Sequence, residues 1–261
     1  IGIQSFDDQK LKVLGRIHSS EEAKRAAAAA AEIFDNFNLD LMFALPGQTF
    51  DELEKDISTA LSFGSPHLSY YQLTIEPNTY FGKYEPANLP DDDIRADMSD
   101  LVAESLVQKG LEHYEISGYA RPGFQCRHNL NYWQYGDYFG IGPGAHGKLT
   151  RDKQIWRTVS AMNPELWKEK VHSGGTGLVK DIKTPQEDIP FEFMLNVLRL
   201  REGVPTELWE KRTFLSYASI RSTVEKLQNV GMLVKTPNLL KTTETGWNFL
   251  NCVQEEFLCT K

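Results

Sequence analysis

The sequence predicts an α/β fold in its first half and a small α+β domain in its second half. Two observations carry this prediction. Short apolar segments alternate with longer amphipathic ones over the first half of the chain, which indicates a mostly parallel sheet with helices on its outer face. From residue 187 onward the hydrophobic pattern is helical, with one short hairpin before a last helix.

Cap and turn residues set the limits of the elements in the first half. Ser19 and Glu22 have the spacing of a capping box, so the alanine-rich residues 20–34 are expected to be helical. Pro46 and Gly47 end a predicted strand, and Gly110 ends a predicted helix. The expected strands span residues 1–5, 38–45, 67–75 and 111–116. Two further helices are expected, one that starts at Thr49 and runs to about residue 63 and one that residues 91–93 lead and that runs to about residue 109.

The pattern changes after Gly147. Residues 148–186 are mixed and glycine-rich, so we expect three parts: residues 1–147, a connecting segment over 148–186, and a last domain over 187–261. The last domain resembles a winged-helix fold, with helices expected over residues 188–201, 206–212 and 217–229, a hairpin over 232–241 and a helix over 244–258.

Composition argues against some partners. The 261 residues carry a net charge of −8, which disfavours nucleic acid and anionic membranes as main partners. No apolar run is long enough to span a membrane. Cys126, Cys252 and Cys259 are an odd number without the close spacing of a zinc or iron–sulfur loop, which favours a reducing compartment over a disulfide framework.

Polar residues follow the predicted strands, where α/β barrels carry their chemistry. Gln4, Arg16 and Asp40 form the first candidate site. The guanidinium of Arg16 suits a carboxylate, and the carboxylate of Asp40 could accept hydrogen bonds from hydroxyl groups. An amino-acid carboxylate and a ribose would fit these groups. The alternative is a surface arginine after a helix and an aspartate near a strand start.

A second candidate site is the run of residues 127–133, which begins one residue after Cys126. The imidazole of His128 is a suitable ligand for haem iron, and Tyr132 and Trp133 could cover a porphyrin face. The alternative is a capped turn in which His128 bonds backbone groups and the two aromatic rings fill core. Cys126 is a conceivable alternative ligand, although a buried thiol more often packs.

Three further features give weaker signals. The glycine-rich residues 140–147 suit either a bound planar or phosphate-bearing ligand or a tight crossing of backbone segments. Arg221 and Lys226 are too few basic residues to favour DNA binding by the winged-helix-like part. The remaining scattered histidines have no partner at ligand spacing and are read as capping or core residues; they are His18, His67, His113 and His172.

Taken together, the motifs resemble the radical S-adenosylmethionine (SAM) proteins of the oxygen-independent coproporphyrinogen III oxidase family. Residues 128–133, with the pattern His-Asn-x-x-Tyr-Trp, are most similar to its HemW haem-chaperone branch, and residues 198–203 fit the family's C-terminal domain. The motifs occur in order over the whole chain at residues 2–6, 14–18, 40–49, 67–71, 114–117, 128–133 and 140–146.

The resemblance implies the later half of a partial (β/α)6 barrel that holds a 4Fe–4S cluster and SAM. It also implies haem as a ligand, and His128, beside Tyr132 and Trp133, is then the expected iron ligand. Its cluster cysteines, in a C-x-x-x-C-x-x-C loop, do not occur in this sequence and are expected upstream of Ile1. The SAM-contacting positions implied by the resemblance are Gln4, Arg16, Asp40, Thr74, Ala145 and His146.

The absence of those cysteines leaves two interpretations: a fragment of a longer protein, or a naturally truncated product that is inactive alone. The resemblance implies a protein of haem metabolism that binds haem and passes it to an acceptor protein. The enzymatic alternative is radical decarboxylation of coproporphyrinogen III, and a second alternative is a non-catalytic binding module. The expected location is the cytoplasm, or a mitochondrion or chloroplast if the source is eukaryotic.

Overall fold

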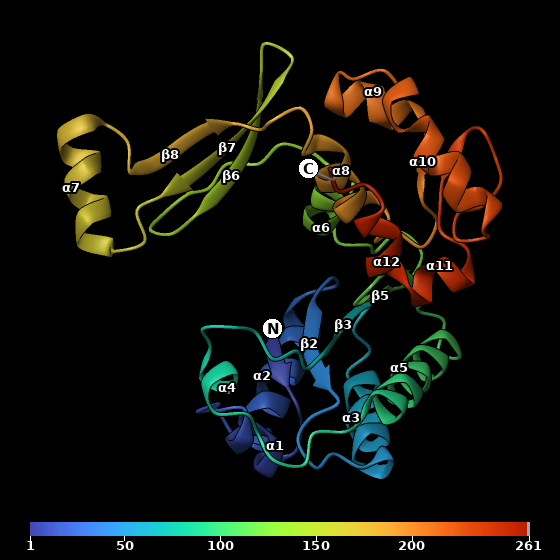
Figure 1. Cartoon of the computed structure of the whole chain (residues 1–261). Coiled ribbons are helices and arrows are strands. Elements are labelled where there is room, and N and C mark those ends of the chain that lie inside the picture. Colours follow the sequence, from blue (N-terminus) through green and yellow to red (C-terminus); the bar gives the residue numbers. More distant parts are fainter. Residues whose placement is uncertain (260–261) are drawn as a thin grey trace. The chain divides into compact units, whose positions relative to one another are not determined.

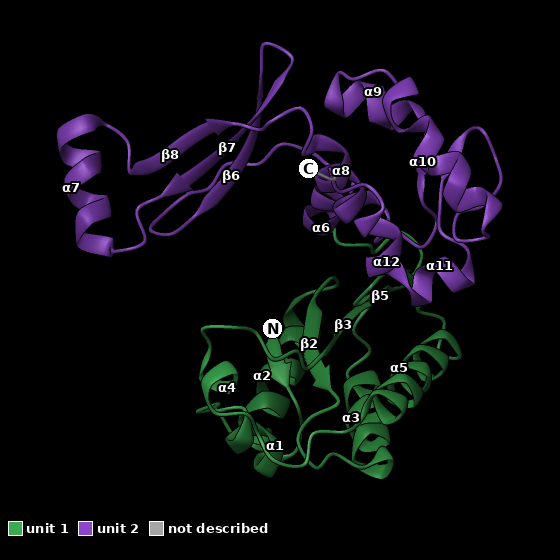
Figure 2. Ribbon diagram, in the orientation of Figure 1, with its two compact units in different colours: residues 1–126 green, residues 127–261 purple. Residues whose placement is uncertain are grey.

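The computed structural model describes residues 1–259, and the chain forms two compact units, unit 1 from Ile1 to Cys126 and unit 2 from Arg127 to Lys261 (Figure 1, Figure 2). Residues 260 and 261, the end of the predicted last domain, lie outside the described residues. Within the described residues, no helix combines the length and the apolar character needed to cross a membrane. The three-part division of the chain stays a prediction.

Unit 1 alternates strands and helices as the sequence predicts. Ser19 and Thr49 each begin a helix with a complete capping box, closed by Glu22 and Glu52 respectively. In chain order the elements are β1 (Gly2–Gln4), α1 (Asp8–Val13), α2 (Ser20–Ile33), β2 (Asn38–Phe43), α3 (Phe50–Ser62), β3 (His67–Gln72), α4 (Tyr80–Lys83), α5 (Asp92–Val107), β4 (Glu112–Glu115) and β5 (Gly118–Ala120).

The sheet of unit 1 has the order β1-β2-β3-β5-β4. β1, β2 and β3 are parallel, as predicted, but β5 pairs antiparallel with both β3 and β4. The expectation of a mostly parallel sheet is therefore wrong at this edge. The physical reason is the short turn after Glu115: a connection of two residues can only return the chain antiparallel, whereas a parallel strand needs a long crossover.

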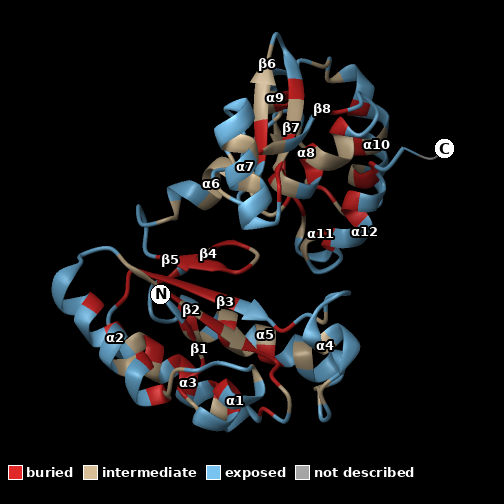
Figure 3. Ribbon diagram, turned by 90° about the vertical axis from the view of Figure 1, so that its left-hand side faces the viewer, coloured by how far each residue is buried: buried red, intermediate tan, exposed pale blue. Residues whose placement is uncertain are grey.

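The two faces of this sheet differ in chemistry. Along β2, Leu39, Leu41 and Phe43 are buried and alternate with half-buried residues, because side chains of a strand point to opposite faces in turn. The buried face packs against α2, α3 and α5 and forms the core of the unit (Figure 3). The opposite face, here called the inner face, carries polar side chains.

Unit 2 begins with α6 (Arg127–Trp133) and a three-stranded antiparallel sheet in the order β6-β7-β8. This sheet and α7 occupy residues that the sequence analysis left without elements. Helices and one small strand pair follow. The elements after α6 are β6 (His146–Arg151), β7 (Gln154–Ser160), α7 (Pro164–Gly174), β8 (Leu178–Lys183), α8 (Ile189–Val197), β9 (Val204–Pro205), α9 (Glu207–Thr213), α10 (Ala218–Asn229), β10 (Leu239–Leu240), α11 (Glu244–Asn248) and α12 (Leu250–Glu255).

Two expectations for the end of the chain need correction. The predicted hairpin over residues 232–241 is reduced to an isolated bridge between Leu233 and Thr242, and β10 pairs with the distant β9 instead. The predicted helix over 244–258 is divided at Phe249, whose φ of −112° and ψ of 38° leave the helical region. The first correction comes from a pairing between residues distant in sequence.

Candidate functional site

The pairing of β1 with β2 places Gln4 on the strand next to the one that carries Asp40. Gly2 on β1 lies in register with Asp40 on β2. Gln4 has a φ of 70°, which is uncommon for a residue with a side chain, and its amide nitrogen lies 2.8 Å from where a Cβ on Gly2 would sit. The side chain of Gln4 therefore folds back over Gly2, beside the strand that carries Asp40, and any larger residue at position 2 would displace it.

A buried carboxylate on α3 holds the turn after Gln4. The hydroxyl of Ser5 donates to Asp56 at 2.6 Å, and the backbone N–H of Phe6 donates to the other oxygen of Asp56 at 2.9 Å. Burial raises the pKa of Asp56, and the hydrogen bonds from Ser5 and Phe6 partly oppose this shift. The turn is thus fixed from the core side, which holds Gln4 in its left-handed conformation.

Asp40 belongs to a chain of polar side chains along the inner face. The amide of Asn38 donates to Asp40 at 2.8 Å, and the amide oxygen of Asn38 lies 2.7 Å from Nδ1 of His67. The other ring nitrogen of His67 lies 2.8 Å from the hydroxyl of Tyr114 on β4. Burial lowers the pKa of His67 to about 4, despite the opposing charge of Asp40, so the ring is neutral at physiological pH.

Arg16 and Thr74 lie at the carboxyl ends of the strands. Arg16 is exposed in the loop after α1, where its backbone N–H donates to Leu11. Thr74 is exposed just after β3 and lines a hollow of about 550 Å³. That hollow is completed by residues 12–15, which directly precede Arg16, and by residues of the segment from Glu76 to Phe81. The structure therefore brings Thr74 close to the start of the loop that carries Arg16.

In unit 2, α6 presents His128 and Tyr132 on one side. The two rings are one helical turn apart and meet edge to face, with centroids 4.7 Å apart. Tyr132 also contacts Tyr138 edge to face at 4.5 Å. His128 is exposed, so its imidazole is accessible to a ligand. The capped-turn alternative is not what the structure forms, since these residues make a helix.

Trp133 has a different environment from His128. Its ring is half-buried and lies under the guanidinium of Arg199, at 4.3 Å. The indole N–H is buried with no hydrogen-bond partner in the described structure. The structure thus joins His128 with Tyr132, while Trp133 packs toward the part of unit 2 that holds α8.

The glycine-rich loop before β6 is a crossing of backbone segments at two of its positions. A Cβ on Gly140 would lie 2.4 Å from the carbonyl oxygen of His146, and a Cβ on Gly147 would lie 2.4 Å from Oγ1 of Thr158. Only glycine allows such close approach. Ala145 and His146, the remaining SAM candidates, lie at the start of β6 in unit 2, where Ala145 is half-buried and His146 is exposed.

Comparison with known proteins gives the family. A profile of the HemN C-terminal domain matches residues 184–249. Two curated proteins called heme chaperone HemW are each 44% identical over 260 residues. The match covers 99% of this chain and 66% of the protein from Haemophilus influenzae, and 99% and 67% for the protein from Escherichia coli. This chain belongs to the HemW family.

The chain spans about two thirds of the length of these bacterial HemW proteins. The mouse protein called radical S-adenosyl methionine domain-containing protein 1, mitochondrial, is 35% identical over 223 residues, which are 81% of this chain and 50% of that protein. The solved structure of the radical SAM enzyme HemN from Escherichia coli superposes with a TM-score of 0.77 at 17% identity, covering 99% of this chain and 63% of that one. The predicted fold class and family resemblance are confirmed.

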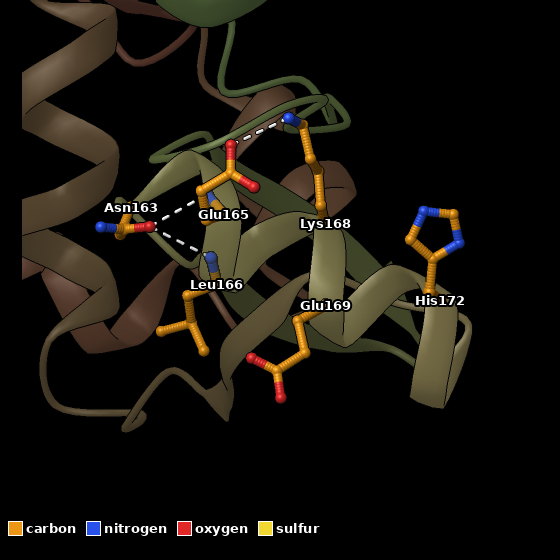
Figure 4. A pocket seen from close by; sticks show the side chains of 6 residues that line it. All are labelled: Asn163, Glu165, Leu166, Lys168, Glu169 and His172. Atoms are coloured by element: carbon orange, nitrogen blue, oxygen red, sulfur yellow. Dashed lines mark hydrogen bonds and ion pairs between the residues drawn. The ribbon is translucent and has the colours of Figure 1, made fainter.

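The remaining hollows of this HemW-family chain are less suited to ligands. One hollow, of about 650 Å³, runs along α7, and Figure 4 shows its side chains spread over the helix surface. Glu165 pairs with Lys168 at 2.9 Å, and Asn163 caps the helix by accepting from backbone N–H groups, so these groups are already satisfied. Within residues 1–259, no group of three or more His, Cys, Asp or Glu side chains is arranged to hold a metal ion.

Sequence reasoning missed two residues of the inner face. The sequence alone indicates only that Asn38 starts a strand and that His67 is a capping or core histidine. His67 is indeed buried, but both of its ring nitrogens have side-chain partners. The available signal was the alternation of β2 and β3, which puts Asn38, Asp40 and His67 on the face opposite the leucines.

Proposed function

We propose that this chain is the larger part of a HemW-type radical SAM protein that binds haem and passes it to an acceptor protein. The observation that carries the proposal is the accessible His128 beside Tyr132 on α6. Neutral imidazole is a common axial ligand of haem iron, and an aromatic ring next to it offers van der Waals contact to a porphyrin edge. The proposal places the protein in the cytoplasm, which suits its three free cysteines.

The inner face of unit 1 supports SAM as the second ligand. The carboxylate of Asp40 accepts hydrogen bonds and suits ribose hydroxyls, and the amide of Gln4 both donates and accepts. The exposed guanidinium of Arg16 suits the carboxylate of the methionine part, and Thr74 lines the adjoining hollow. Beside a reduced 4Fe–4S cluster, SAM supplies radical chemistry. In this proposal, the residues of the inner face hold and orient the cofactor.

The haem proposal is tested by titrating haem into the wild-type chain and into His128→Ala while recording the Soret band. We expect the variant to lose affinity by about tenfold or more and to change its Soret maximum, because an axial ligand is removed. His172→Ala is a matched control, since His172 is an exposed histidine of the same unit. Equal spectra and affinities for all three proteins would exclude His128 as the ligand.

The SAM proposal is tested by calorimetric titration of S-adenosylhomocysteine into the wild-type chain and into Asp40→Ala. Loss of hydrogen bonds from ribose hydroxyls to a charged acceptor is expected to weaken binding by about tenfold or more. Asp100→Ala removes an exposed aspartate of the same unit and is expected to bind like the wild type. Binding that is indifferent to Asp40 would contradict the assignment of the inner face.

A further inference from the structure

Four side chains of the inner face form a hydrogen-bond chain that ends at Asp40. It runs from Tyr114 on β4 through His67 on β3 and Asn38 on β2 to Asp40 on the same strand. Asn38 and His67 are direct partners in the parallel register of β2 and β3, which places their side chains side by side. His67 is only 3% exposed and Tyr114 only 8%, whereas the side chain of Asp40 is 32% exposed. The chain therefore leads from the interior to an accessible carboxylate.

The chemistry of the groups fixes the direction of every hydrogen bond. A carboxylate only accepts, so the NH2 group of Asn38 must face Asp40, and the amide oxygen of Asn38 must face His67. That oxygen also accepts from Ser69 at 3.1 Å. Nδ1 of His67 must therefore carry the ring proton and donate. Nε2 then accepts from the hydroxyl of Tyr114, whose oxygen in turn accepts from the backbone N–H of Cys126 at 3.4 Å.

We propose that His67, held as its Nδ1–H tautomer, is a positioning residue that orients the carboxylate of Asp40 through Asn38 to receive the hydroxyl groups of a nucleoside ligand. The role in ligand binding rests on the proposed SAM site, but the orientation of Asp40 does not. A core-filling role alone would be served by an apolar side chain. Instead, the imidazole of His67 lies on the polar face, and each of its two ring nitrogens has a different hydrogen-bond partner. Burying both nitrogens costs desolvation energy, which a purely packing role would not require.

The low pKa of His67 is consistent with this arrangement. A protonated ring would donate from both nitrogens and would compete with the hydroxyl proton of Tyr114 for one position. Burial keeps the ring neutral, since it lowers the pKa of His67 to about 4. One tautomer of His67 is therefore retained over the physiological pH range.

Two substitutions of His67 separate positioning from packing. The side-chain amide of His67→Asn places an N–H near the position of Nδ1 and can still donate to Asn38, whereas that of His67→Gln places it near Nε2 and cannot. Both are polar and smaller than or similar to histidine, so both disturb the core. Nitrogen NMR of the imidazole reports the tautomer of the wild-type chain. Hydrogen exchange of the Asn38 side-chain amide reports whether the link to Asp40 is intact in each variant.

We expect the Nδ1–H tautomer in the wild type, slow exchange of the Asn38 amide in the wild type and His67→Asn, and at least tenfold faster exchange in His67→Gln. S-adenosylhomocysteine should bind His67→Gln about tenfold more weakly than His67→Asn. An Nε2–H tautomer, or equal loss of protection in both variants, would overturn the inference. If the tautomer and protection are as expected but the wild-type chain binds no nucleoside, the orientation of Asp40 stands and the proposed SAM site fails.

Discussion

The two units bury polar groups in different ways. In unit 1 the buried chain from Tyr114 through His67 ends at the accessible Asp40. In unit 2, Lys148 is 2% exposed, yet it donates to the backbone of Tyr135 at 3.1 Å and pairs with Asp137 at 2.9 Å. The carboxylate of Asp137 is 40% exposed, but it already accepts from Lys148 and from both the backbone N–H and the hydroxyl of Thr150, so this network closes on the loop it supports. A buried charge with an exposed partner therefore does not by itself mark a site; the partners that the exposed carboxylate already holds also decide.

The largest effect of breaking a network is expected in unit 2. Asp137→Ala leaves Lys148 buried without its carboxylate and should lower the free energy of unfolding by about 3 kcal/mol in urea denaturation. Burial already lowers the pKa of Lys148, and the hydrogen bond to Asp137 opposes that shift, which is why losing the partner is costly.

Lys148→Met tests whether the buried charge of Lys148 is the reason why Asp137→Ala lowers the free energy of unfolding. Because it removes the buried charge, combining it with Asp137→Ala should cost less than the sum of the two single substitutions. Asp137 also accepts from Thr150 at 2.7 Å, so Asp137→Asn serves as the control that retains an acceptor there. Strict additivity would show that Lys148 and Asp137 do not depend on each other.

In unit 1 the expected effect is a dependence on pH. The pKa of His67 is about 4 in the folded chain, below its ordinary value of 6.5, so the unfolded chain binds more protons between these values. Stability is therefore lost as pH falls from about 6.5 toward 4, by at most about 1.4 kcal/mol per pH unit. For His67→Asn, the free energy of unfolding should change less with pH between about pH 7 and about pH 5 than it does for the wild type, as measured by urea denaturation at each pH.

Asp56 changes the stability of unit 1 with pH in the opposite direction to His67. Burial raises its pKa in the folded chain, so its contribution to stability is present at low pH and is lost as pH rises through the folded pKa. The wild-type profile is the sum of both effects, and only the difference from His67→Asn isolates the histidine. Parallel profiles for the two proteins would contradict a neutral, desolvated His67.

A smaller effect is expected at the turn after β1. Ser5→Ala removes the hydroxyl that donates to Asp56 at 2.6 Å and should destabilise the chain by about 1–2 kcal/mol, because the carboxylate remains buried. Ser62→Ala makes the same change at an exposed position of α3 and should cost less than about 0.5 kcal/mol. Equal costs for the two serines would show that the turn is held by something other than Asp56.

The sequence predicts those parts of the molecule that depend on local signals. The capping box of Ser19 and Glu22 is present. β2 lies within the strand that the sequence predicts over residues 38–45, before Pro46. The antiparallel edge of unit 1, the sheet over residues 146–183 and the pairing of β9 with β10 were not predicted, because strand pairing is decided between segments distant in sequence.

The candidate site shows the same limit. Motif spacing proposes Gln4, Arg16 and Asp40 as site residues, but the link from Asp40 to His67 is set by the register of β2 on β3. Asn38 and His67 are separated by 29 positions, with a whole helix between them, and no local pattern connects two such residues. The partners that orient a candidate residue such as Asp40 are therefore read from the structure, while the candidate itself is proposed from the sequence.

The smallest effect on stability is expected at His128. Its side chain is exposed and its ring contact is with Tyr132, so His128→Ala should change the free energy of unfolding by less than about 0.5 kcal/mol. Trp133→Ala should cost clearly more, because its half-buried ring packs under Arg199. Chemical denaturation of both variants decides between these roles. If His128→Ala destabilises the chain as much as Trp133→Ala, the histidine holds α6 in place, and a loss of haem binding in that variant would no longer identify it as the iron ligand.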